Sequence, residues 1–165
     1  MKVAMPGVDE VEALAPLADV VVPPAWEDLN GHVNVMHYLE LSALATGPML
    51  AELGIDEAQV RRQRRGLFDI EHHIWYLHEL HVGDQVSLHV RYLARSAKRF
   101  HGNLFIVNRT RRRLASVFEF VTTGADLDTR RAAALPAQVI ARLDALIAAH
   151  GRLGWPAPQS GVLAA

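Results

Sequence analysis

The spacing of hydrophobic residues divides the chain into two regions with different periodicities. Residues 35–53 carry apolar side chains on nearly every side of a helical wheel, whereas the segments after Leu67 alternate apolar and polar residues. The first pattern predicts a long helix that the rest of the protein encloses. The second predicts four strands, which we place at 68–77, 85–95, 101–109 and 113–123.

Shorter elements are predicted on both sides of this pattern. Three valines at 20–22 form a short strand that ends at two prolines, and residues 1–19 have only weak periodicity. Apolar residues at helical spacing predict an amphipathic helix over 137–149. Inside the long helix, Gly47-Pro48 predicts a kink or break, and the basic run 61–65 predicts an exposed link after it.

The order of these elements predicts an α+β fold in one domain over residues 1–165, with its core at about 20–147. The turns between the four strands are short enough for three antiparallel hairpins. The simplest packing wraps this antiparallel sheet around the long helix and closes it with the C-terminal helix. Such a sheet covers only part of an apolar helix, so we expect a second copy to extend the sheet edge to edge as a homodimer. Whether dimers pair into a dimer of dimers is left open.

Composition narrows the classes of partner. The 165 residues include 17 Lys plus Arg and 18 Asp plus Glu, a net charge of −1 that gives no general attraction to nucleic acid or to an anionic membrane. We therefore expect neither partner. Acidic residues interrupt the N-terminal segment, and no apolar run approaches the length needed to cross a bilayer. These features predict a soluble, cytoplasmic protein.

The absence of cysteine and the placement of histidine limit the chemistry. With no Cys, thiolate nucleophiles and Cys-ligated metals are excluded. Among the nine His, His72 and His73 are neighbours on a predicted strand and point to opposite faces, and no metal-ligand spacing is visible. We expect no metal and no cofactor.

The densest group of polar residues precedes the long helix. Residues 28–34 contain a carboxylate, two amides and an imidazole, namely Asp28, Asn30, Asn34 and His32. A helix N-terminus offers free N–H groups and partial positive charge, which suit a carbonyl oxygen that becomes an oxyanion. A nearby carboxylate can serve as a base or a nucleophile. Taken singly, Asp28, Asn30 and Asn34 are also typical of turns and helix caps, but their density favours a site.

Residues 28–34 together with Tyr38 resemble the hallmark of hotdog-fold thioesterases of the 4-hydroxybenzoyl-CoA thioesterase type and of acyl-ACP thioesterases. The similarity continues through 71–77, 82–84 and 126–131, and it covers roughly residues 20–147. Within this family the chain most resembles the thioesterases associated with carnitine breakdown, whose substrate is betainyl-CoA. The resemblance implies a hotdog fold and hydrolysis of an acyl-CoA, with coenzyme A present only as part of the substrate.

The resemblance also implies a role for each residue of the site. Asp28 matches the catalytic carboxylate and would attack the thioester or activate a water, and Asn30 and His32 would orient Asp28 or that water. Val35 would donate its backbone N–H to the thioester oxygen. Glu71 lies near the place of a second carboxylate, although a solvent-facing strand residue is an equal interpretation. The catalytic candidates are thus Asp28, Asn30, His32, Asn34 and Glu71.

Substrate contacts are predicted from aromatic and basic residues. Aromatic faces attract a quaternary ammonium such as a betainyl group, and four aromatic residues lie near the predicted site: Trp26, Tyr38, Trp75 and Tyr76. Each of them alone is more typical of an ordinary core residue. The phosphates of coenzyme A would meet either the basic hairpin of Arg95, Lys98 and Arg99 or the basic run 61–65, though most such runs are solvated surface.

Two other functions stay open at this point. A hotdog hydratase or dehydratase typically has Asp and His five residues apart with Asn-Pro between them, whereas Asp28 and His32 are four apart with Gly31 before the histidine. The loop spacing therefore argues against that reaction. A domain that binds acyl-CoA without turnover would keep the same fold and motif. The acyl group and its chain length are not predicted.

Overall fold

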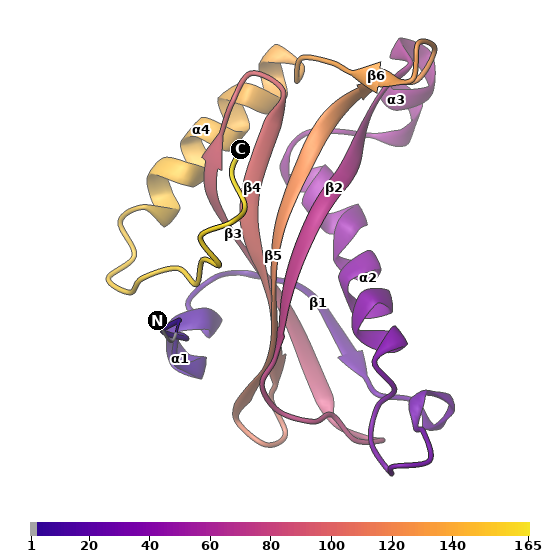
Figure 1. Ribbon diagram of the computed structural model, residues 1–165, viewed down its shortest axis with the longest axis vertical. Helices are drawn as coiled ribbons and strands as arrows, with labels where there is room; N and C mark the ends of the chain where they lie inside the picture. Colours follow the sequence, from indigo (N-terminus) through magenta and orange to yellow (C-terminus); the bar gives the residue numbers. More distant parts are fainter. Residues whose placement is uncertain (1–2) are drawn as a thin grey trace.

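The computed structural model describes residues 3–165, and its strands form one six-stranded antiparallel sheet in the order β1-β3-β4-β5-β2, with β6 paired to β5 (Figure 1). The sheet curls along α2, and α4 lies beside β3. In chain order the elements are α1 (Val8–Glu12), β1 (Pro16–Val21), the 3-10 helix η1 (Pro24–Trp26), α2 (Met36–Glu52), α3 (Glu57–Gln63), β2 (Arg65–Tyr76), β3 (Gln85–Arg95), β4 (Arg99–Asn108), β5 (Arg113–Asp126), β6 (Arg131–Ala132) and α4 (Ala137–His150). The predicted α+β arrangement of one sheet against a long helix is present.

The four long strands are present, but the predicted hairpin between the first two is wrong. β2 pairs with β5, and β3 pairs with β1 and β4. The segment between β2 and β3 is instead tied to the β4–β5 turn through the buried Asp84, whose carboxylate accepts hydrogen bonds from the His81 N–H, Asn108 Nδ2 and Arg111 Nε. β3 already pairs with β1 on one side and with β4 on the other, so β2 joins the opposite end of the sheet, next to β5.

The long helix is continuous from Met36 to Glu52, so of the predicted kink or break at Gly47-Pro48 the break is absent. Pro48 cannot donate a hydrogen bond to the carbonyl of Leu44, but Leu44 is 47% exposed and water can satisfy that carbonyl. As expected for a single copy of the sheet, the chain covers only part of the helix. Tyr38, Leu41 and Ala45 are buried against the sheet, while apolar side chains on the other side of α2 face solvent.

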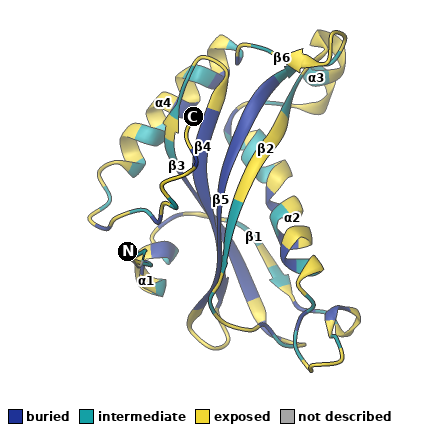
Figure 2. Ribbon diagram, viewed as in Figure 1, coloured by how far each residue is buried: buried dark blue, intermediate teal, exposed yellow. Residues whose placement is uncertain are grey.

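Two apolar clusters lie on opposite faces of the sheet. The larger one joins α2 and α4 to the inward residues of β3, β4 and β5, and it includes Leu41, Val90 and Leu143. The smaller one packs α1 and the C-terminal tail on the other face, around Phe105 and Trp155. Figure 2 shows the result, with the central strands buried and β2 exposed along one side of the sheet. β2 is therefore an edge strand, paired with β5 on one side and with no strand of the described chain on the other.

Three smaller expectations need correction or addition. The weakly periodic residues before Val20 contain α1 and most of β1 within the described part of the chain, whereas residues 1–2 lie outside it. Part of the predicted basic link is the end of α3, and its last residue, Arg65, begins β2. The arginines of the 61–65 run are exposed, as expected. Within residues 3–165, no helix has the length and apolar character needed to cross a membrane.

Candidate active site

The loop before α2 holds Asp28 in a fixed position. Its backbone N–H donates to the carbonyl of His32 over 2.9 Å, and its carbonyl accepts from the N–H of Gly31 over 3.0 Å. This tight turn requires a positive φ at Gly31, which is +77°. The carboxylate Oδ1 of Asp28 accepts a hydrogen bond from the N–H of Asn30 at 2.8 Å. The side chains of Asn30 and His32 make no hydrogen bond to that carboxylate in the described structure.

The N-terminus of α2 begins directly after this loop. The side-chain oxygen of Asn34 accepts a hydrogen bond from the N–H of Met36 at 3.0 Å, so Asn34 caps the helix. Within residues 3–165 the N–H of Val35 has no hydrogen-bond acceptor. That N–H is one of the unpaired donors at the positive end of a helix, and it is available to a ligand's oxygen atom.

A cavity of about 280 Å³ opens beside this helix terminus, and we call it the N-terminal cavity. The rings of Tyr38 from α2 and Tyr76 from β2 meet inside it edge to face, with centroids 5.2 Å apart. The hydroxyl of Tyr38 donates to the carbonyl of His78 at 3.4 Å. Burial raises the pKa of the Tyr38 phenol, and the charge of Glu79 raises it further. The cavity is lined by His32, Val33, Val35, Tyr38, Tyr76, Leu77, His78 and Glu79.

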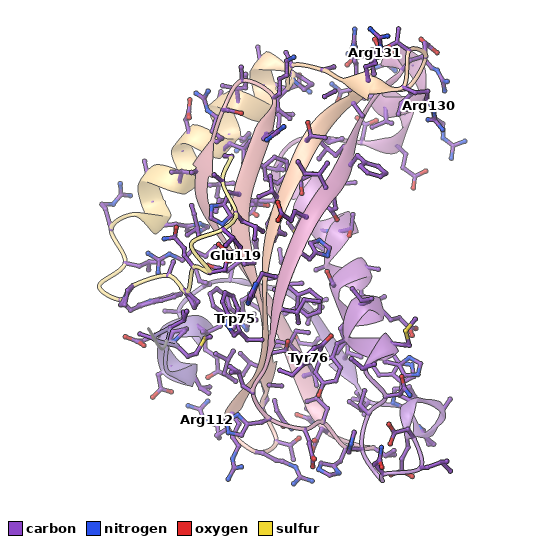
Figure 3. The ribbon with its side chains drawn as sticks, in the orientation of Figure 1. Trp75, Tyr76, Arg112, Glu119, Arg130 and Arg131 are labelled. Atoms are coloured by element: carbon purple, nitrogen blue, oxygen red, sulfur yellow. The ribbon has the colours of Figure 1, made fainter. Side chains whose placement is uncertain are left out.

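The structure separates the four aromatic candidates. Trp75 and Tyr76 are successive residues of β2 and point to opposite sides of it, with Tyr76 towards α2 (Figure 3). Trp75 packs into the cluster on the other face, where its ring is 4.3 Å from that of His73. Trp26 is buried and stacks on His37 at 4.9 Å. Only Tyr38 and Tyr76 of this set line the N-terminal cavity.

The structure does not bring Glu71 to the Asp28 loop. Glu71 is paired with Val121, whose side chain lies on the face of the sheet turned away from α2, because the alternate residues Phe120 and Thr122 line the α2 side. Glu71 is exposed there. The carboxylate that β2 directs towards α2 is that of Asp69, which is paired with Thr122.

Asp69 and His72 share a face because of an irregularity in β2. Residues three apart in a strand normally point to opposite sides, but the register shifts at Ile70 between Asp69 and Glu71. One extra residue therefore turns both side chains towards α2. The Asp69 carboxylate accepts a hydrogen bond from the hydroxyl of Thr122 at 2.5 Å and lies 3.6 Å from His72 Nε2. The neighbouring His72 imidazole lowers the pKa of Asp69, and the hydrogen bond from the Thr122 hydroxyl adds to this against the effect of burial.

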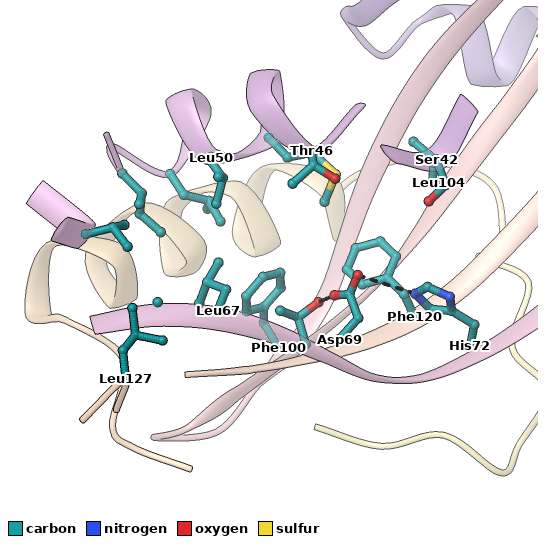
Figure 4. A pocket seen from close by; sticks show the side chains of 16 residues that line it. Ser42, Thr46, Leu50, Leu67, Asp69, His72, Phe100, Leu104, Phe120 and Leu127 are labelled. Atoms are coloured by element: carbon teal, nitrogen blue, oxygen red, sulfur yellow. Dashed lines mark hydrogen bonds and ion pairs between the residues drawn. The ribbon is translucent and has the colours of Figure 1, made fainter. Parts of the chain in front are cut away.

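These residues line a second cavity of about 320 Å³ between α2 and β2 (Figure 4). Most of its walls are apolar, and its polar side chains are Ser42, Thr46, Asp69, His72 and Thr122. On α2, Ser42 is seven residues after Val35, which corresponds to about 10 Å along the helix axis. The second cavity is thus farther along the same groove than the N-terminal cavity. The alternation of β2 alone does not predict Asp69 at this cavity, because counting every second residue along the strand assigns it to the opposite face.

The predicted basic residues are far from the loop within one chain. Arg95 is paired with Asp144 by two hydrogen bonds of 2.8 and 2.5 Å, Lys98 is in the turn beside it, and Arg99 is the first residue of β4. That turn is at the far end of β3, about 33 Å from the end next to the Asp28 loop at the usual strand rise. A cavity of about 310 Å³ adjoins the N-terminal cavity and is lined by Leu77, His78, Glu79, His81, Arg111 and Arg113. The cations nearest the loop therefore come from the arginine run of the β4–β5 turn.

No group of three or more His, Cys, Asp or Glu side chains within residues 3–165 is arranged to hold a metal ion.

The chain is similar in sequence to known proteins that are described as thioesterases. The family model described as the thioesterase-like superfamily matches residues 22–143. The chain is 30% identical over 135 residues to a betainyl-CoA thioesterase of Pseudomonas aeruginosa, covering 82% of this chain and 85% of that protein. It is 27% identical over 140 residues to an L-carnitine dehydrogenase/betainyl-CoA thioesterase of Rhizobium meliloti, covering 85% of this chain and 28% of that larger protein.

Two solved structures are also similar. A Staphylococcus aureus protein, described as hypothetical and solved in complex with CoA, superposes with a TM-score of 0.78 at 22% identity, covering 87% of this chain and 90% of its own. A putative thioesterase of Pseudomonas putida gives a TM-score of 0.73 at 24% identity, with 98% and 97% covered. At these identities, the structural similarities establish the fold.

Proposed function

Because this chain belongs to the thioesterase-like superfamily, we propose that it hydrolyses an acyl-CoA in the N-terminal cavity, with Asp28 as the base or nucleophile. The hotdog fold and the thioester hydrolase activity expected from the sequence are confirmed by the comparisons. The observation that carries the location of the reaction is the free N–H of Val35, which lines this cavity at the start of α2. Asp28 is in the loop that leads into the helix and is not among the residues that line the cavity.

The first part of the mechanism concerns the thioester carbonyl. In our proposal its oxygen accepts a hydrogen bond from Val35 N–H, and the partial positive charge of the α2 N-terminus polarises the C=O bond. Negative charge grows on this oxygen as the tetrahedral intermediate forms. The interaction therefore strengthens towards the transition state and lowers the barrier.

The second part concerns Asp28. Its Oδ1 is held by the Asn30 N–H, and within the described chain its Oδ2 makes no hydrogen bond. Asp28 either removes a proton from a water that attacks the carbonyl carbon or attacks that carbon itself, in which case water then hydrolyses the anhydride. In both routes the C–S bond breaks, a carboxylic acid forms and the CoA thiolate takes up a proton. A thiol with a pKa near 8.5 leaves readily without a metal.

We propose betainyl-CoA, or another short acyl-CoA, as the substrate. Two curated relatives carry the name betainyl-CoA thioesterase, including the one that is 30% identical. The perpendicular rings of Tyr38 and Tyr76 support this choice, because aromatic faces attract quaternary ammonium groups. The cavity of about 280 Å³ is large enough for such a compact group.

We also propose that the protein acts as a homodimer. β2 has a free edge with exposed Phe68 and Ile70, and α2 exposes Met36, Leu39 and Leu44, with relative exposures between 42% and 65%. An uncovered apolar edge strand next to an apolar helix face is typical of an interface. Two identical edges pair by a two-fold axis, which would extend the sheet and cover both surfaces.

Thiol release from a panel of acyl-CoAs tests the proposed reaction. The panel contains betainyl-, acetyl-, decanoyl- and benzoyl-CoA, and free thiol is measured colorimetrically with the wild-type protein. We expect betainyl-CoA or another short acyl-CoA to give the highest kcat/KM. No release from any member by folded protein would contradict the proposed function and favour acyl-CoA binding without turnover.

A further inference from the structure

The N-terminal cavity combines aromatic walls with a single carboxylate. Its eight lining residues include only one acidic side chain, Glu79, which follows the end of β2. The field of Glu79 reaches the Tyr38 hydroxyl, since its charge contributes to the raised pKa of that phenol after the larger effect of burial. A carboxylate beside two perpendicular rings is the combination that binds a cation lacking N–H donors, through charge and cation–π attraction.

From this arrangement we infer that Glu79 is the residue that selects a positively charged acyl group, by acting as its counter-ion while Tyr38 and Tyr76 pack against it. The inference rests on the proposed function, because it assumes that the thioester carbonyl binds at Val35. It goes beyond that proposal by naming the side chain that distinguishes a cationic acyl group from a neutral one of equal shape.

The reach of a betainyl group supports this assignment. Its nitrogen is two bonds from the carbonyl carbon, about 2.5 Å away at ordinary bond lengths. With the carbonyl oxygen about 2.9 Å from Val35 N–H, the nitrogen stays in the cavity that Val35, Tyr38 and Glu79 all line. Asp28, in the loop before α2, acts on the thioester carbonyl in our proposal, and Asp69 is the carboxylate that β2 directs towards α2. It lines the second cavity, which begins at Ser42, about 10 Å farther along the helix, so it is out of reach in the same chain.

The surroundings of Glu79 leave its carboxylate accessible. The side chain is 64% exposed, and His81 Nε2 lies 3.6 Å from Glu79 Oε2. The residues that face it across the adjoining cavity are His78, His81, Arg111 and Arg113, and Arg111 is already paired with Asp84 at 3.3 Å. A bound acyl group would displace water from the N-terminal cavity, which strengthens the attraction between the two charges.

Two substrates of the same shape test the inference. Betainyl-CoA and 3,3-dimethylbutanoyl-CoA differ only in a central N⁺ or C, so the ratio of their kcat/KM values measures the preference for charge. We expect wild-type protein to prefer betainyl-CoA. Glu79→Gln should lower that ratio about tenfold, chiefly through a higher KM for betainyl-CoA and with a much smaller change for the neutral thioester. Glu79→Asp should keep part of the preference.

Asp69→Asn is the matched control, since it removes a carboxylate from the neighbouring cavity and should leave the ratio unchanged. A ratio that falls in Asp69→Asn but not in Glu79→Gln would overturn the inference. So would equal hydrolysis of both thioesters by the wild type, although the proposed function would then stand. Failure to hydrolyse either thioester would also overturn the inference, whereas only failure with the whole acyl-CoA panel would remove the proposed function itself.

Discussion

At the scale of single residues, the elements around each carboxylate determine what it can do. Asp28 is held in a turn by one backbone hydrogen bond and lies next to a helix terminus. Asp69 lies near His72 and accepts a hydrogen bond from Thr122 inside a cavity, and both contacts lower its pKa. Glu52, near the C-terminal end of α2, has no hydrogen-bond partner for its buried Oε2 within the described chain, and burial raises its pKa. These three carboxylates therefore differ in their hydrogen bonds because their surroundings differ.

Glu52 provides a prediction about stability and pH. A raised carboxyl pKa in the folded state means that folding favours the neutral form. The free energy of unfolding therefore decreases as pH rises above the ordinary value of 4.5, where the unfolded chain ionises first. We expect Glu52→Gln to raise the free energy of unfolding by about 1 kcal/mol at pH 7 and to change it little at pH 4.

Urea denaturation of both proteins at the two pH values measures this effect. Glu71→Gln is the control, because Glu71 is exposed and no such pH-dependent difference is expected for it. A gain in stability that is equal at pH 4 and pH 7 would show that the charge of Glu52 is not its cause.

At the scale of elements, β2 contributes residues to both cavities and forms an edge of the sheet. It directs Tyr76 into the N-terminal cavity, and the irregularity at Ile70 turns Asp69 and His72 into the second one. It is also the free edge of the sheet beside the exposed side of α2. One strand thus contributes to both cavities and to the proposed dimer interface.

The dimer is tested by a charge placed on this edge. Ile70→Lys would bury an ammonium group in the proposed interface, so we expect the dissociation constant of the dimer to rise at least about a hundredfold. Val21→Lys is the matched control, since Val21 is 62% exposed on β1 at the opposite edge. Sedimentation equilibrium over a range of concentrations measures the dissociation constant of the dimer for the wild type and for both variants. A monomeric wild type, or equal association of all three proteins, would contradict the proposed dimer.

At the scale of the whole molecule, the features predicted from the sequence are those that follow from local periodicity. α2, α4 and strands β3 to β5 have apolar patterns that match their backbone periods, and the Asp28 loop was recognised from its density of polar residues. The pairing of β2 with β5 was not predictable in this way, because alternation does not say which strands are neighbours. The ion pair of Arg95 was not predictable either, because its partner Asp144 is 49 residues away in the sequence.

The missed site residues share one physical cause. Asp69 faces α2 only because of the extra residue in β2, and Glu79 is in a connecting segment without periodicity. Glu71 was assigned to the site from its position along the chain, but the register of β2 on β5 directs it to the other face. Each of these placements depends on pairing between distant segments. The chemistry of the loop was therefore easier to predict than the walls of the cavity beside it.

Asp28→Asn shows whether Asp28 performs the chemistry. The amide oxygen of Asn can still accept the hydrogen bond from Asn30 N–H, so the loop is preserved while the base or nucleophile is removed. We expect kcat/KM for betainyl-CoA to fall by about 10² to 10⁴ with an unchanged melting temperature. The control is Asp56→Asn, which retains the cap of α3 and should keep full activity. An Asp28→Asn protein within about threefold of the wild type would contradict the account.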